Sequence, residues 1–144
     1  MKRFTCAVLT FLLAVLTAFV CVGCQSTGDA EGEVLQSSES VLIIRVTETD
    51  GNATLYDVMK KLRANGEIEF VSENSTYGQS LLSVNGVANT SDWSWYWASY
   101  TTDEANGLDE MEWEGETWYY SAAGMSSLQV KKGECYMFLY IEYK

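Results

Sequence analysis

The sequence predicts an α+β domain in which one helix packs on a β-sheet. The helix is predicted from apolar residues at the spacing i, i+3, i+4, i+7, which places them on one helical face. These residues are Leu55, Val58, Met59 and Leu62. The sheet is predicted from the rest of the chain after that helix, where short apolar segments are separated by turn residues. Tryptophans at every second position of residues 92–100 are the clearest strand signal.

The N-terminal segment has the features of an export signal. Two basic residues precede an apolar run over residues 7–22, which is shorter than the ~20 residues of a membrane-spanning helix. The run ends at Gly23-Cys24, which resembles the cleavage site of bacterial lipoprotein signals. We therefore expect residues 1–23 to be a lipoprotein signal peptide and Cys24 to be lipidated. The protein would then be extracytoplasmic and lipid-anchored to the cell membrane, with plain secretion as the alternative.

Residues 24–39 are predicted to be a flexible tether between Cys24 and the folded domain. This segment is dominated by Gly, Ser and Glu, so it has little apolar surface to bury. Once the signal is removed and Cys24 is acylated, Cys135 is the one cysteine left. We therefore expect no disulfide framework, and the domain over residues 40–144 must be stabilised by its core.

The predicted domain begins with a strand and a helix. Residues 41–47 are almost continuously apolar, which is typical of a strand inside a sheet. Thr54 and Asp57 have the spacing of a capping box at a helix N-terminus. Gly66 supplies the left-handed residue that commonly follows a helix.

The remainder is predicted as strands and turns. Asn85-Gly86 is a strong turn signal. The last strand is apolar on both faces and is therefore placed in the centre of the sheet. Residues 103–116 are rich in Asp and Glu, and we expect a solvated hairpin tip there, with a calcium site as the weaker alternative. The predicted strands are residues 68–71, 79–84, 92–100, 117–121 and 134–143.

Trp93, Trp95 and Trp97 are expected to share one face of their strand, because successive side chains of a strand point to opposite faces. Three indoles on one face form either the densest part of a core or a wall for a flat ligand. The sequence leaves both interpretations open.

The composition argues against several classes of function. The chain has 9 Lys and Arg against 20 Asp and Glu, which disfavours binding to nucleic acid. It has no histidine, so the commonest general base and the commonest metal ligand are both missing. We expect a protein that is not an enzyme, requires no cofactor and has no metal site.

One helix after the first strand, followed by strands that end in a central one, is the order of a β-grasp-like mixed sheet with a single packed helix. Several short segments also match a known family: Thr54-Leu55-Tyr56-Asp57, Leu82-Ser83-Val84-Asn85-Gly86-Val87, Trp93-Ser94-Trp95-Tyr96, Gly124-Met125, and Leu128 through Lys132-Gly133-Glu134. On these segments, residues 41–143 resemble the transcobalamin-like C-terminal domain of bacterial surface lipoproteins. The vertebrate cobalamin carriers have an additional helical domain over the ligand, so a lone domain of this kind would have half a site, which a partner protein could complete.

The resemblance implies binding of a small ligand, with a corrinoid such as cobalamin favoured over another planar or glycan-like molecule. The alternative is a protein–protein interaction or adhesin module that uses the same aromatic strand face. The ligand-binding residues that the resemblance and the aromatic pattern indicate are Asn85, Gly86, Val87, Trp93, Trp95, Trp97, Trp118, Tyr119, Gly124 and Met125.

Overall fold

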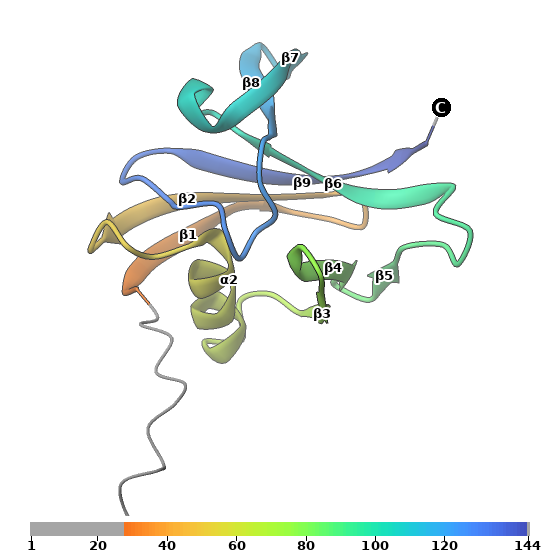
Figure 1. Ribbon diagram of the computed structural model, residues 1–144, viewed down its shortest axis with the longest axis horizontal. Helices are drawn as coiled ribbons and strands as arrows, with labels where there is room; N and C mark the ends of the chain where they lie inside the picture. The colour runs from red at the N-terminus through yellow and green to blue at the C-terminus, as the bar shows by residue number, and fades with distance from the viewer. Residues whose placement is uncertain (1–27, 144) are drawn as a thin grey trace, which may run out of the picture.

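The computed structural model describes residues 28–143, which form two β-sheets and one α-helix (Figure 1). The larger sheet has six strands in the order β1-β2-β9-β6-β8-β7, and the smaller has three in the order β3-β4-β5. This confirms the predicted α+β class. The elements are β1 (Ala30–Ser37), β2 (Val41–Thr49), α2 (Leu55–Ala64), β3 (Phe70–Ser75), β4 (Gly78–Val84), β5 (Val87–Ala88), β6 (Trp95–Thr101), the 3₁₀-helix η1 (Glu104–Asn106), β7 (Gly107–Trp113), β8 (Glu116–Ser121) and β9 (Cys135–Glu142).

β2 lies inside the larger sheet and β9 lies at its centre, as the sequence predicts. β2 lies between β1 and β9, and β9 lies between β2 and β6. Their side chains are buried on both faces of the sheet, as at Leu42, Ile44 and Met137. The described strands of both sheets pair antiparallel, so the parallel pair that a mixed sheet would contain is not among them.

β1 corrects the predicted tether. The prediction that residues 24–39 are a flexible tether is wrong over Ala30–Ser37, which pair antiparallel with β2. An edge strand needs an apolar side chain only where it meets the core, so a polar segment can form one. Ala30 is buried there, and Gly32 passes so close to α2 that a Cβ would lie 2.7 Å from the Val58 side chain. The folded domain therefore begins by residue 30, not residue 40.

The α2 helix starts and stops as predicted. Asp57 N donates to Thr54 Oγ1 at 3.4 Å, and Thr54 N donates to Asp57 Oδ2 at 2.9 Å, which completes the capping box. Gly66 follows the helix with φ of 76°. The four apolar residues that predicted the helix are all buried.

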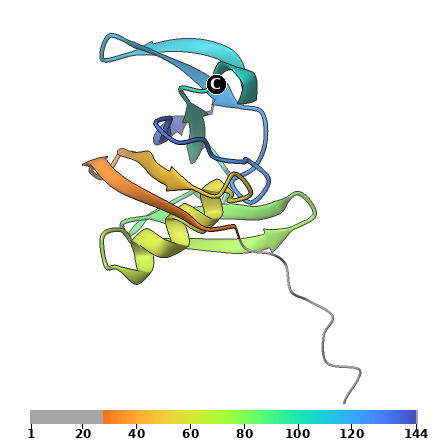
Figure 2. The ribbon, with the colours of Figure 1, turned by 90° about the vertical axis from the view of Figure 1, so that its left-hand side faces the viewer.

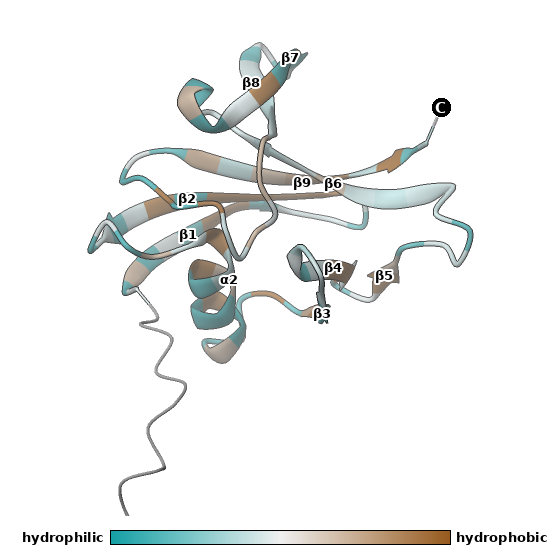
Figure 3. Cartoon of the chain, in the orientation of Figure 1, coloured by the Kyte–Doolittle hydropathy of each residue, from teal (hydrophilic) through white to brown (hydrophobic). Residues whose placement is uncertain are grey.

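The larger sheet is covered on both faces. α2 and the smaller sheet pack on one face, and the β7–β8 hairpin lies over the other (Figures 1 and 2). The hairpin can leave the plane of the sheet because β8 pairs with β6 only at Tyr100↔Tyr120 and Thr101↔Tyr119. Figure 3 shows hydrophobic residues along β2 and β9, between the two layers. The buried core of the hairpin side consists of Val41, Ile43, Ala98, Tyr100, Trp118, Met137 and Leu139.

The acidic segment at residues 103–116 is a strand for half its length. Within β7, Glu110 and Glu112 are exposed, whereas Met111 and Trp113 pack against the core on the hairpin side. The predicted hairpin tip is confined to Glu114-Gly115, both at positive φ. Glu110 and Glu112 therefore lie on the outer face of a strand whose inner face carries Met111 and Trp113.

The predicted signal peptide and the lipidation site Cys24 lie outside the described residues. Within residues 28–143, no helix has the length and apolar character that crossing a membrane requires.

Candidate functional site

The paired ends of β6 and β9 project beyond the rest of the sheet. β9 pairs with β2 only as far as Leu139, but it pairs with β6 as far as Glu142. The last residues of β9 and the first of β6 therefore form a two-stranded ribbon, visible near the C-terminus in Figure 1. β2 does not pair with this part of β9, and the aromatic side chains at the outer end of the ribbon are exposed, as at Trp95.

One face of the ribbon carries a row of packed rings. Tyr140 lies between Trp95 and Trp97, with ring centroids 5.6 Å and 5.3 Å away. Trp97 is only 6% exposed, and its Nε1 donates to Val87 O at 2.8 Å. Trp95 is 41% exposed and forms the outer end of the row. Trp97 is therefore a core residue, whereas Trp95 is a surface residue.

Trp93 corrects the prediction that three indoles share one face. It precedes β6 and has φ of 59°, so the alternation that holds along a strand does not extend to it. Its side chain lies with Asp92, Tyr96 and Tyr143 around a cavity of about 450 Å³. Tyr96 is the neighbour of Trp95 on the strand and points to the opposite face. We call this cavity the Trp93 groove.

The turn that carries Trp93 is fixed by hydrogen bonds. Asp92 Oδ1 accepts from Ser94 N at 3.1 Å and from Ser94 Oγ at 2.8 Å, while Trp93 N donates to Thr90 O at 3.0 Å. The bonds from Ser94 N, and then those involving the Thr90 and Ser94 side chains, lower the pKa of Asp92 to about 2. Asp92 is therefore ionised at neutral pH and places a negative charge at the rim. Trp93 is 51% exposed and Tyr143 is 73% exposed, so the groove is open to solvent.

The other predicted ligand-binding residues lie in several different places. Asn85 and Gly86 form the predicted turn with φ of 46° and 84°, and Asn85 Nδ2 donates to Ser37 Oγ at 2.7 Å. Met125 is buried against α2, whereas Gly124 is exposed near the turn between β3 and β4.

Trp118 and Tyr119 lie on β8, at the far side of the larger sheet. Of the ten predicted residues, Val87, Trp95 and Trp97 come together with Tyr140 on one face of the ribbon. Trp93 alone lines the Trp93 groove.

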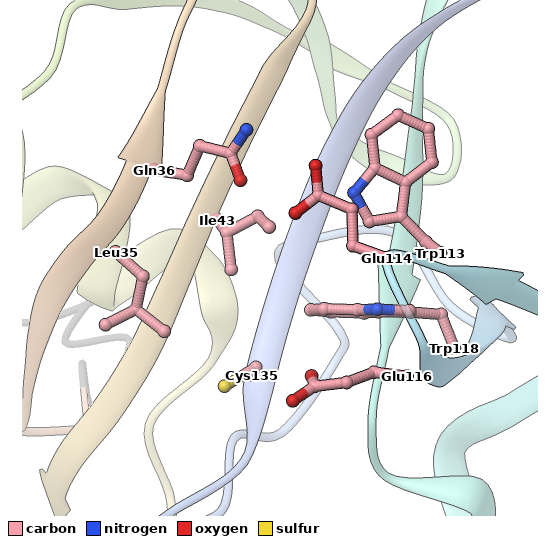
Figure 4. A pocket seen from close by; sticks show the side chains of 8 residues that line it. All are labelled: Leu35, Gln36, Ile43, Trp113, Glu114, Glu116, Trp118 and Cys135. Carbon is pink, nitrogen blue, oxygen red and sulfur yellow. The ribbon is translucent and has the colours of Figure 1, made fainter.

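A second pocket, about 200 Å³ in volume, lies beneath the β7–β8 hairpin (Figure 4). We call it the hairpin pocket. The turn at Glu114-Gly115 sets Trp113 opposite Glu116 and Met111 opposite Trp118, so these four side chains share the inner face of the hairpin. The residues that line the pocket are Leu35, Gln36, Ile43, Trp113, Glu114, Glu116, Trp118 and Cys135.

The indole nitrogens of the hairpin pocket have no partners. Nε1 of Trp113 and Nε1 of Trp118 are buried, and neither forms a hydrogen bond with any residue in the described part of the chain. Trp118 is 2% exposed. A buried donor without an acceptor costs about 1–3 kcal/mol, so native proteins rarely retain one without a reason.

The floor of the hairpin pocket has a thiol that stays protonated. Burial raises the pKa of Cys135, and Glu116 and Glu134 raise it further, while Arg45 lowers it. Because its pKa is raised, the thiol is not an activated nucleophile. Sequence reasoning missed this pocket, although the alternation of Met111 and Trp113 before a Glu-Gly turn is a hairpin signal.

No protein-family model matches the chain, and no curated protein is found to be similar to it. In the part of the chain that the structure describes, no group of three His, Cys, Asp or Glu side chains is placed to hold a metal ion.

Proposed function

We propose that the protein is a lipid-anchored extracytoplasmic lipoprotein whose domain binds a small ligand with a flat apolar surface, with a corrinoid favoured. The order of the elements supports a β-grasp-like arrangement. The β1–β2 hairpin is followed by α2, and the last strand, β9, returns to the sheet beside β2. The transcobalamin-like resemblance of residues 41–143 supports the choice of a corrinoid.

The observation that carries the proposal is the exposed Trp93 in a fixed turn beside two tyrosines. A tryptophan that is half exposed contributes little to the core, and the backbone at positive φ is strained for a residue with a large side chain. Tyr96 and Tyr143 pack 6.4 Å apart beside it. Together these three aromatic side chains give a flat ligand a large contact area.

The size of the groove supports a shared site. Drug-sized ligands occupy pockets of roughly 300–1,000 Å³ and are mostly buried in them. The Trp93 groove, at about 450 Å³, is open to solvent and is too small to enclose a corrinoid with its nucleotide. A partner protein would therefore cover the exposed side of the ligand.

The chemistry of the groove limits how a corrinoid would be held. The chain has no histidine that could coordinate cobalt. Binding would rest on contact between the ring and the aromatic side chains, and on hydrogen bonds from the ligand's amide side chains to the ionised Asp92.

The position of β1 shortens the distance from the proposed anchor. Residues 25–29 separate Cys24 from the start of β1 at Ala30. Such a segment spans at most about 20 Å when fully extended. The domain would therefore lie close to the membrane surface, with the Trp93 groove at the end of the larger sheet away from Ala30.

Equilibrium dialysis of the full-length protein in detergent against a panel of corrinoids tests the proposal. We expect saturable binding that Trp93→Ala weakens at least tenfold. Trp95→Ala is the matched control, because Trp95 is similarly exposed but lies on the other face of the ribbon. Equal losses in both variants, or no binding of any corrinoid, would contradict the proposal.

A protein–protein interaction or adhesin module is the second candidate function. It is favoured by the presence of exposed aromatic side chains on both faces of one projecting ribbon, namely Trp93 and Tyr143 on one and Trp95 on the other. Tryptophan and tyrosine dominate the energetics of many protein interfaces. A cell-surface partner whose binding is weakened equally by Trp93→Ala and Trp95→Ala would support this alternative over ligand binding.

A further inference from the structure

We propose that the hairpin pocket binds a small organic cation that also carries a hydroxyl or carbonyl oxygen. This site is separate from the Trp93 groove and involves none of its residues. The proposal rests on two buried indole N–H groups without acceptors and on two carboxylates at the same pocket.

The two indole N–H groups favour a ligand with a hydrogen-bond acceptor. Trp118 is almost fully buried and lines the pocket, and its Nε1 has no partner among the described residues. Nε1 of Trp113 is in the same condition. Figure 4 shows both indoles among the pocket-lining side chains, with Trp118 seen edge-on. An indole N–H is a donor only, so a ligand must bring an oxygen that accepts.

The two carboxylates favour a ligand with a positive charge. Glu116 shares the inner face of the hairpin with the two indoles, and Glu114 is at the turn. Neither forms an ion pair within residues 28–143. Arg45, which lies opposite Cys135 in the sheet, is already paired with Glu33, with Nε donating at 2.7 Å. An anionic ligand would be repelled, whereas a cation gains both the carboxylates and the faces of the indoles.

The opposite wall provides the apolar and polar contacts of a small molecule. The register of β1 against β2 shifts between Val34 and Gln36, and this bulge lets Leu35 and Gln36 both line the pocket. Ile43 adds an aliphatic surface, and the protonated Cys135 adds a neutral one. A volume of about 200 Å³ suits a molecule the size of an amino alcohol or an amino sugar.

Isothermal titration calorimetry of the full-length protein in detergent with choline, ethanolamine and glucosamine tests the proposal. For the ligand that binds, removing the charge or removing the oxygen should each weaken binding about tenfold or more. For choline, 3,3-dimethyl-1-butanol is the neutral isostere, and tetramethylammonium is the cation without a hydroxyl. Binding of none of the three cations would overturn the proposal. So would equal affinity for choline and its neutral isostere or for choline and tetramethylammonium.

Three variants locate the binding. Glu116→Gln removes the inner carboxylate and should weaken binding about tenfold. Trp113→Phe retains a ring but removes the N–H. It should weaken the binding of oxygen-bearing cations and leave the affinity for tetramethylammonium unchanged. Glu112→Gln is the control, because Glu112 is on the outer face of β7 with its Oε1 accepting from Thr117 Oγ1. Unchanged affinity in Glu116→Gln, or equal losses in Glu112→Gln, would refute the assignment.

Discussion

Replacing Trp97 with alanine removes a side chain that joins the larger sheet to β5. Trp97 is 6% exposed, packs 5.3 Å from the Tyr140 ring and donates from Nε1 to Val87 O. Truncating a buried tryptophan costs ~3–5 kcal/mol, and the unpaired carbonyl adds to this. We expect a loss of about 4 kcal/mol, a large share of the ~5–15 kcal/mol by which a domain is stable.

Urea unfolding followed by far-UV circular dichroism measures this loss. With a slope of about 2 kcal/mol per M, the midpoint should fall by about 2 M in Trp97→Ala. Trp95→Ala and Trp93→Ala should each shift the midpoint by less than about 0.5 M, because their side chains are 41% and 51% exposed. Equal shifts in the three variants would refute the division into one core indole and two surface indoles.

Three further predictions concern the helix cap, acid stability and the anchor. Thr54→Ala should destabilise the protein by about 1 kcal/mol in the same urea assay, because it removes half of the capping box. Burial opposes ionisation of Asp103, but bonds from Lys131 and Asn106 and the charge of Lys131 outweigh it and lower its pKa below 3.8. The ionised Asp103 therefore stabilises the folded protein fully above pH 3.8, and this contribution is lost as the pH falls through the lowered pKa. In thermal melts at a series of pH values, Lys131→Met should lose less stability on acidification than the wild type. Metabolic labelling with a palmitate analogue should tag the wild type and not Cys24→Ala, and a Cys24→Ala protein that stays labelled would contradict the lipoprotein interpretation.

The sequence predicts the elements whose local signals agree with their packing. The apolar run of β2, the helical spacing of α2 and the two apolar faces of β9 each reflect burial in the structure. A strand that is apolar on both faces must be buried on both faces, which places it inside a sheet. The positions of these three elements in the fold could therefore be predicted from the sequence.

The sequence does not predict the elements whose stability comes from a neighbour. β1 is polar because it is an edge strand, and pairing with β2 stabilises it. Trp93 is consistent with a strand in sequence, but the hydrogen bonds of its turn give it positive φ. Each depends on contacts that a local pattern does not encode.

The candidate sites were predicted only in part for the same reason. The aromatic alternation indicates Trp95 and Trp97 on one face, yet it cannot show which of the two is covered by Val87. The hairpin pocket needs Trp113 of β7 and Gln36 of β1, which come together only because the sheet curls. Such long-range placement follows from the whole fold and not from any one segment.

A visible-absorption titration of a corrinoid with the full-length protein tests the central proposal most directly. We expect saturable binding with a spectrum that matches the free ligand at the same pH, because the chain has no histidine to coordinate cobalt and the pKa of Cys135 is raised. Binding should be lost in Trp93→Ala and kept in Trp95→Ala. A base-off spectrum with a protein ligand on cobalt, or an absence of saturable binding, would contradict the account.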